Sequence, residues 1–151
     1  MKQEKPHLLN LPFMNINTRY INGKREIWDD LRKKWLVCTP EEWVRQNFIR
    51  FLTEYLNADP LYIKQEHVVN LNGVSLRADI VVYDKNVKPL MLVECKAPTI
   101  KITEKTINQV CKYNMIMKVP YICVTNGINH FFYYYSEDQE CMEAMKNIPV
   151  F

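Results

Sequence analysis

Two carboxylates and a lysine stand at the ends of two apolar runs within residues 77–98, RADIVVYDKNVKPLMLVECKAP. Asp79 precedes the polar turn DKNVK, Glu94 follows it, and Lys96 comes two residues after Glu94. Carboxylates that meet can hold a hard divalent cation such as Mg²⁺. An amine beside that cation can orient an attacking water or stabilise charge that builds on a phosphate. These residue types would therefore suit phosphate-ester chemistry if folding brings them together.

A β-hairpin would bring the two acids together. With its turn centred between residues 86 and 87, the predicted cross-strand pairs are Tyr83–Leu90, Val81–Leu92 and Asp79–Glu94. Directly opposed Cβ atoms in an antiparallel pair are about 4.5–5.5 Å apart. A slip of one residue would send the two carboxylates to opposite faces of the sheet.

Opposed like charges destabilise a strand pair, so this pair needs compensation. A shared proton would raise one pKa, Lys96 could bridge the carboxylates, or a divalent cation could bind them with the carbonyl oxygen of Cys95 as a further ligand. A plainer interpretation places the acids at solvent-facing strand ends, in surface salt bridges with Lys96 or Arg77 that contribute little. The spacing of the three residues does not decide among a shared proton, a lysine bridge, a bound cation and surface salt bridges.

The clearest helix is predicted for residues 39–57, TPEEWVRQNFIRFLTEYLN. Thr39 suits the N-cap and Pro40 the first helical position, and Glu42 stands at the third, where its side chain would complete a capping box. Apolar residues follow at helical spacing. Residues 57–60 are expected to end the helix.

The remaining elements define the fold class. A second helix is predicted for residues 102–118, with Thr103 as its N-cap. Strands are predicted for residues 62–71, 74–83, 89–97, 120–127 and 128–136. The order α-β-β-β-α-β predicts an α+β or mixed α/β fold around one central sheet flanked by helices.

The two ends of the chain give weaker patterns. Residues 1–26 are expected to form an arm, or a short strand pair, packed on the single domain of residues 1–151, because their apolar residues argue against a free tail. Residues 25–37 are expected to form a short strand and a turn of helix, and residues 137–148 a short helix.

The composition of the chain excludes few functions. A net charge of +3 is weak evidence for a nucleic-acid partner. The five cysteines are scattered singly, which favours a reducing cytoplasm over a disulfide framework. The apolar runs are too short to span a bilayer, and no GxxxxGK(S/T) loop occurs, so no P-loop ATPase is expected in these residues.

The order of elements, together with RADIVVY and LVECKAP, resembles the PD-(D/E)XK nuclease superfamily. The likeness is greatest to the N-terminal nuclease domain of type I restriction enzyme R subunits, which TPEEWVRQ, VECKAP and VTNG also resemble, and it covers roughly residues 27–135. It implies a restriction-endonuclease-like core that hydrolyses DNA phosphodiester bonds. It also implies Mg²⁺ or Mn²⁺ held by Asp79, Glu94 and the carbonyl of Cys95, with Lys96 assisting.

The same resemblance implies further site residues in the two helices. The first helix of such nucleases often contributes a glutamate to the metal site, here Glu42 with Glu41 as its competitor, although capping explains Glu42 equally well. RecB-like members carry QxxxY in the second helix, and QVCKY offers Gln109 and Tyr113 on one helical face. A surface glutamine beside a half-buried tyrosine is the plainer interpretation. Glu66 could approach the site or face solvent.

The resemblance implies DNA as a partner. R subunits join this domain to an ATP-driven motor, so a separate motor or specificity protein is a further expected partner. The alternative function is a catalytically silent module on the same fold that binds nucleic acid or another protein. A third possibility is a plain interaction protein in which residues 1–26 mediate dimerisation. Strand preference, sequence specificity, exo- versus endonuclease action and oligomeric state stay open.

Overall fold

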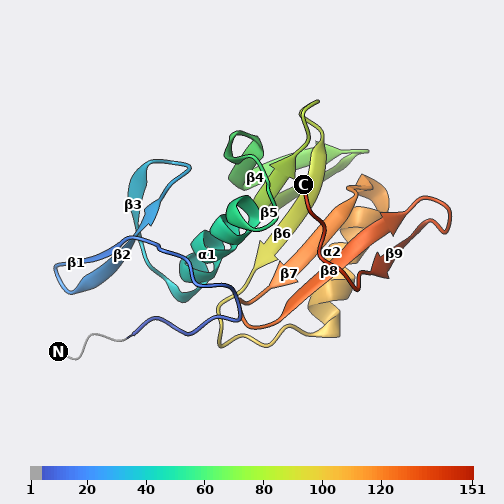
Figure 1. Ribbon diagram of the computed structural model, residues 1–151. Coiled ribbons are helices and arrows are strands. Elements are labelled where there is room, and N and C mark those ends of the chain that lie inside the picture. Colours follow the sequence, from blue (N-terminus) through green and yellow to red (C-terminus); the bar gives the residue numbers. More distant parts are fainter. Residues whose placement is uncertain (1–4) are drawn as a thin grey trace.

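The computed structural model describes residues 5–151 and contains two sheets (Figure 1). The small sheet has the order β1-β2-β3, and the large sheet has the order β4-β5-β6-β7-β8-β9. The elements are β1 (Thr18–Ile21), β2 (Lys24–Asp29), β3 (Lys34–Val37), α1 (Pro40–Glu54), a 3₁₀ helix (Pro60–Tyr62), β4 (Ile63–Leu71), β5 (Val74–Tyr83), β6 (Pro89–Cys95), α2 (Glu104–Met117), β7 (Tyr121–Thr125), β8 (His130–Ser136) and β9 (Cys141–Ala144).

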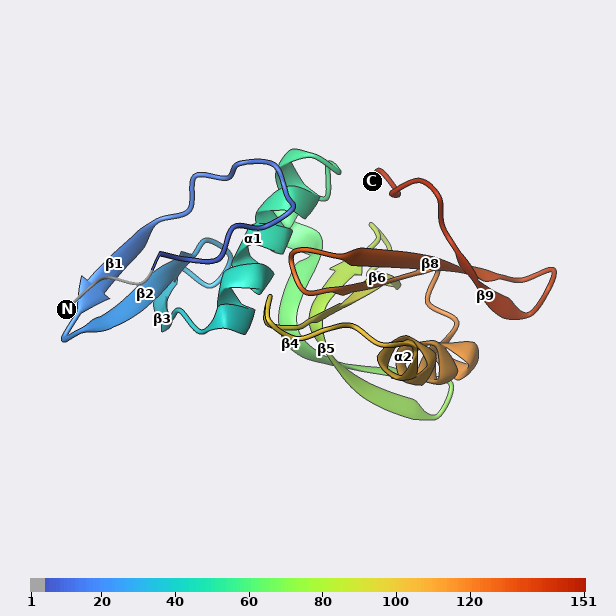
Figure 2. The same cartoon turned by 90° about the horizontal axis from the view of Figure 1, so that it is seen from below.

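The segment from α1 to β7 has the predicted order α-β-β-β-α-β, which confirms the mixed fold with one central sheet. β6 and β7 are parallel, and the other neighbours in the large sheet are antiparallel. Parallel neighbours need a long crossover connection, and α2 supplies it. Figure 2 shows α1 and α2 on opposite faces of the large sheet. The two faces therefore have separate cores, with one cluster under α1 and two under α2.

The start of α1 confirms the predicted cap but not the whole capping box. The Thr39 hydroxyl accepts a hydrogen bond from the Glu42 N–H at 3.0 Å, and Pro40 occupies the first turn. The reciprocal bond is absent because the Thr39 N–H donates to the Val37 carbonyl. The Glu42 carboxylate instead accepts a hydrogen bond from Gln46 at 2.8 Å. Capping therefore does not account for the Glu42 side chain.

The β5–β6 hairpin has the predicted register in the part of the strands that leads to Asp79 and Glu94. Val81 pairs with Leu92, as predicted, and Ile80 pairs with Val93. The predicted Tyr83–Leu90 pair is wrong, because an irregularity after Val82 shifts Tyr83 to Pro89. The Asp84 carboxylate accepts two turn N–H groups and holds the chain in this tighter arrangement.

Two predictions for the ends of the chain are wrong. Residues 25–37 form no helical turn, because β2 and β3 pair and the Asp29 carboxylate accepts the N–H groups of Leu31 and Arg32 in the turn between them. Residues 137–148 form β9 in place of a helix, because the exposed edge of β8 offers backbone partners from Tyr133 to Ser136.

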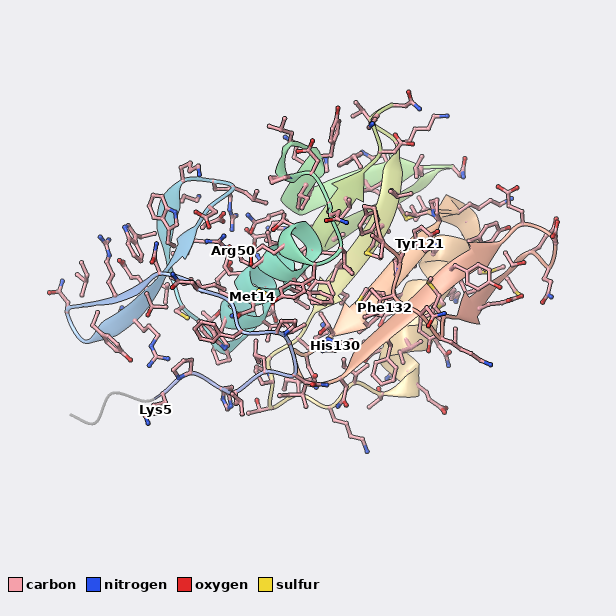
Figure 3. The ribbon with its side chains drawn as sticks, in the orientation of Figure 1. Lys5, Met14, Arg50, Tyr121, His130 and Phe132 are labelled. Atoms are coloured by element: carbon pink, nitrogen blue, oxygen red, sulfur yellow. The ribbon has the colours of Figure 1, made fainter. Side chains whose placement is uncertain are left out.

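Residues 5–17 have no regular structure but pack across the domain, as expected for an arm. Met14 is buried beside α1 (Figure 3), in the cluster that also contains Phe132. The Asn10 N–H donates to the Gly127 carbonyl at 2.8 Å, and the Trp43 indole donates to the His7 carbonyl at 3.0 Å. The first four residues lie outside the described range. The expected boundary at residue 26 falls inside β2.

Candidate active site on strands β5 and β6

The register of the hairpin places the two acids opposite each other. The Ile80–Val93 pair is followed by Asp79 and Glu94 in the same alignment. Asp79 is tied to the neighbouring strand, because its Oδ2 accepts a hydrogen bond from the Cys95 N–H at 2.7 Å. Lys96 Nζ donates to Glu94 Oε1 at 2.9 Å. Asp79, Glu94, Cys95 and Lys96 are therefore brought together where the end of β6 lies beside the middle of β5.

The electrostatics of this group show an excess of negative charge. Burial raises the pKa of Glu94, and repulsion from Asp79 raises it further, while the hydrogen bond and charge of Lys96 act in the opposite direction. The hydrogen bond with Glu94 raises the pKa of Lys96 in spite of partial burial. The lysine is thus held charged, and one ammonium group does not balance two carboxylates.

A pocket of about 260 Å³ opens beside Glu94 and Lys96. Gln109 and Tyr113 of α2 line it, together with Arg77 of β5. The QxxxY residues of the second helix therefore share a cavity with the ExK residues of the strand. The remaining lining residues are Leu76, Ala78, Leu92, Val93, Thr106 and Val110.

Arg45 is the residue at the site that the sequence interpretation did not assign. Its side chain is only 5% exposed, and its Nη2 lies 3.4 Å from an oxygen of Asp79 and 3.4 Å from one of Glu41. Its Nη1 lies 3.3 Å from Glu66 and 3.4 Å from Glu42. A signal was present in EEWVR, because an arginine three and four residues after glutamates lies on their helical face.

Glu66 approaches the site, which settles the alternative left open above. The β4–β5 pairs Gln65–Ile80 and His67–Ala78 bracket Glu66 and Asp79, so these acids face each other across the two strands. Three carboxylates, of Glu66, Asp79 and Glu94, thus form a row across β4, β5 and β6. Arg45 neutralises one end of the row and Lys96 the other.

The two glutamates at the start of α1 differ in environment. Glu42 is buried and lies beside Arg45 and Gln46, whereas the Glu41 side chain is 43% exposed. Among the described residues, the lining of the pocket includes neither of them. In this geometry, Glu42 contacts the site through Arg45.

The small sheet is joined to the same acidic row by Arg32, in the turn between β2 and β3. Its Nη1 donates to Glu66 at 2.9 Å, and its Nε donates to the fully buried Asp29 at 2.5 Å. Burial acts to raise the pKa of Asp29, but hydrogen bonds from Arg32 and Gln65 outweigh it and lower that pKa. The Asp29 carboxylate is therefore ionised, and its ion pair with Arg32 holds the small sheet in place.

Within residues 5–151, no three His, Cys, Asp or Glu side chains converge closely enough to hold a metal ion by themselves. Arg45 lies within ion-pair distance of both Glu66 and Asp79. Asp79 is thus shared between Arg45 on one side and the Cys95 N–H on the other, whereas Glu94 is paired with Lys96.

The family model for the N terminus of the type I restriction enzyme R protein matches residues 40–149. This chain belongs to that family. Its family and its α-β-β-β-α-β core define a nuclease-like domain of restriction-endonuclease type.

A solved structure from Anabaena variabilis, of a DUF820 protein described as a candidate nuclease, is 14% identical to this chain. The similarity covers 93% of this chain and 84% of that one, with a TM-score of 0.48. No curated protein matches the sequence. No helix within residues 5–151 has the length and apolar character needed to cross a membrane.

Proposed function

We propose that this protein is a metal-dependent deoxyribonuclease that hydrolyses phosphodiester bonds. The observation that carries the proposal is the meeting of Asp79 and Glu94 across two strands, with Lys96 hydrogen-bonded to Glu94. Membership of the restriction enzyme family supports DNA as the substrate.

The donor set fits one Mg²⁺ or Mn²⁺. Mg²⁺ usually takes only one or two protein carboxylates and keeps several waters, so two acids suffice. Burial raises the pKa of Glu94 first and repulsion from Asp79 raises it further, and a cation between the two carboxylates would relieve that repulsion. The Cys95 N–H points to Asp79, and because N–H and C=O of one strand residue project to the same side, its carbonyl is the natural third oxygen. When bound, the metal would supply a water of lowered pKa and stabilise charge on the phosphate.

The other residues would act on the substrate through charge and position. Lys96 would donate hydrogen bonds to the scissile phosphate or orient the attacking water. Gln109 and Tyr113 would hold the phosphodiester in the pocket that they share with Lys96. Glu42 would act indirectly, because it helps to hold Arg45 beside Asp79.

The contact between Arg45 and Asp79 favours one alternative, a catalytically silent module that binds nucleic acid. Arg45 is an internal cation that already compensates Asp79 without any metal. Calorimetric titration with Mn²⁺ separates the two functions. A nuclease should bind the ion with an affinity at least about tenfold higher than its Asp79→Ala variant, equal to about 1.4 kcal/mol.

Asp138→Ala is a matched control for the titration, because Asp138 is exposed in the turn between β8 and β9. It should bind Mn²⁺ like the wild type. Equal isotherms for wild type and Asp79→Ala would favour the silent module.

Cleavage of plasmid and single-stranded DNA in Mg²⁺ or Mn²⁺ tests the chemistry itself. Lys96→Ala removes one charge-stabilising donor and should lower the rate by about 100-fold or more, while Lys85→Ala, in the exposed turn at the other end of the hairpin, should leave it unchanged. Absence of cleavage by the wild type with every divalent ion would refute the enzymatic proposal.

A further inference from the structure

The small sheet of residues 18–37, here called the wing, projects beside α1, and its β2–β3 turn contacts β4 of the large sheet through Arg32 and Glu66 (Figures 1 and 2). It precedes the range that matches the family model, which begins at residue 40. Its role is therefore not given by the family.

The wing carries the whole net charge of the protein. It holds three acidic residues and six basic ones, namely Arg19, Lys24, Arg25, Arg32, Lys33 and Lys34. The resulting surplus of three positive charges equals the formal net charge of +3 of the entire chain. The remaining 131 residues are thus neutral as a whole, and the basic character is concentrated in one projecting element.

The lysines are the exposed part of this surplus. The three acids of the wing are in ion pairs with arginines: Glu26 with Arg19, Asp29 with Arg32, and Asp30 with Arg50 of α1. Lys24, Lys33 and Lys34 are all exposed to solvent. A concentrated positive surface of this kind attracts a polyanion.

A continuous chain of ion pairs joins the wing to the candidate site. Arg32 contacts Glu66, Glu66 contacts Arg45, and Arg45 contacts Asp79. The turn that carries Arg32 also carries Lys33, so the basic surface begins next to the acidic row.

We propose that the wing binds the phosphate backbone of duplex DNA that flanks the cleavage site. The proposal rests on the nuclease function inferred above and adds the surface that holds the substrate. Lys24 lies at one end of β2 and Lys33 follows its other end, and at about 3.3 Å per residue β2 spans about 17 Å. Phosphates of one DNA strand recur about every 3.4 Å along the helix axis, so the length of β2 corresponds to the axial rise of about five phosphates.

The aromatic residues of the wing favour backbone contacts over base stacking. Binding of single strands relies on aromatic faces that are free to stack on bases. The Arg19 guanidinium lies over the Trp35 ring at 4.2 Å, and that of Arg25 lies over the Tyr20 ring at 5.1 Å. Trp28 meets Trp35 edge to face at 5.3 Å. These aromatic rings thus contact arginines or one another within the wing. The lysine side chains of the wing are the groups available to bind a ligand.

Anisotropy measurements on a labelled DNA duplex in EDTA, at several salt concentrations, test the proposal without cleavage. The variant Lys24→Gln/Lys33→Gln/Lys34→Gln should bind at least about tenfold more weakly, and its salt dependence should fall by about 0.9 for each lost phosphate contact. The control Lys85→Gln/Lys88→Gln/Lys146→Gln removes the same charge from exposed positions outside the wing and should bind like the wild type. Circular dichroism and urea unfolding verify that both variants are folded.

Equal weakening in both triple variants would overturn the proposal, because it would show a general effect of net charge. Absence of wild-type binding, or tighter binding to a single strand than to the duplex, would also overturn it. Cleavage in Mn²⁺ is scored separately. If the wing lysines contribute to DNA binding but the protein never cleaves DNA, the nuclease function alone is refuted. If the protein cleaves DNA and the wing variant binds DNA like the wild type, this inference alone is refuted.

Discussion

At the scale of single residues, the charges at the site are arranged around Arg45. Four carboxylates lie within 3.3–3.4 Å of its guanidinium, and its Nε and Nη1 atoms are buried without a hydrogen-bond partner of good geometry. Its contribution is therefore charge compensation more than directed hydrogen bonding. Removal of one partner from a buried ion cluster is costly because it leaves like charges uncompensated.

Replacement of Arg45 tests this compensation. Arg45→Met keeps much of the volume and should lower the free energy of unfolding by about 3 kcal/mol or more. Arg50→Met on the same helix removes a more exposed arginine from two ion pairs and should cost about 1 kcal/mol or less. Urea unfolding without metal measures both, and equal losses would contradict the role of Arg45.

The raised pKa of Glu94 predicts a dependence of stability on pH. At pH 7 the Glu94 carboxylate is ionised in the unfolded state, where its pKa is near the ordinary 4.5, while burial and Asp79 oppose ionisation in the folded state. The folded protein therefore binds more protons, and this group destabilises it at neutral pH. The penalty disappears as the pH falls through the raised folded pKa to below 4.5.

Glu94→Gln removes that penalty. The variant should be more stable than the wild type at pH 7 in metal-free buffer, and the difference should close as the pH is lowered to 4. Thermal unfolding across this pH range measures it, with the exposed Glu137→Gln as the control, expected to stay within about 0.5 kcal/mol of the wild type. A variant that is less stable at every pH would contradict the stated electrostatics.

At the scale of elements, the caps of the two helices position the acids and the pocket residues. Thr39 accepts a hydrogen bond of 3.0 Å at the start of α1, and Thr103 accepts a longer one of 3.4 Å at the start of α2. Thr39→Ala should therefore cost about 1 kcal/mol, and Thr103→Ala less. Urea unfolding compares the two, and a larger loss at Thr103 would contradict the assigned caps.

Elements that are stabilised by neighbours in the chain could be predicted from the sequence, and elements that are stabilised by distant residues could not. The cap of α1 and the Val81–Leu92 alignment of β5 and β6 follow from neighbours in the chain, and both are confirmed, whereas the predicted Tyr83–Leu90 pair beside the turn is wrong. The strand β9 and the β2–β3 pair were missed because their patterns are weak locally. Their stability comes from the edge of β8 and from the buried Asp29, respectively.

At the scale of the whole molecule, residues 5–17 hold the first helix and the turn before β8 together. Gly127 has a φ of +81°, and a Cβ atom there would lie 2.7 Å from Leu9 and 3.2 Å from Val44. This close approach lets the N-terminal segment pass between α1 and the turn. Removal of residues 1–26 would thus expose core surface and cut through β2, so it would not be a clean test of a dimerising arm.

Alanine variants of two glycines with the same backbone conformation distinguish the cost of backbone strain from the cost of overpacking. Gly73 has a φ of +80°, and a Cβ atom added there would meet no other atom within 4 Å, whereas Gly127 is crowded by Leu9. Both alanine variants should lose about 1 kcal/mol from backbone strain, and Gly127→Ala should lose at least about 1 kcal/mol more from overpacking. Thermal unfolding measures the difference, and equal losses would show that Leu9 does not pack there.

The sequence by itself determined the fold class, the helix caps and the opposition of Asp79 and Glu94, because local periodicity fixes the helices and the alternation of apolar residues fixes which faces of β5 and β6 meet. Only the tertiary structure decided that Glu66 joins the acidic row, that Arg45 compensates it, and that Arg32 joins the wing to it. Those relations depend on side chains more than 20 residues apart, whose charges interact only once packing has brought them within a few ångströms and removed the water between them.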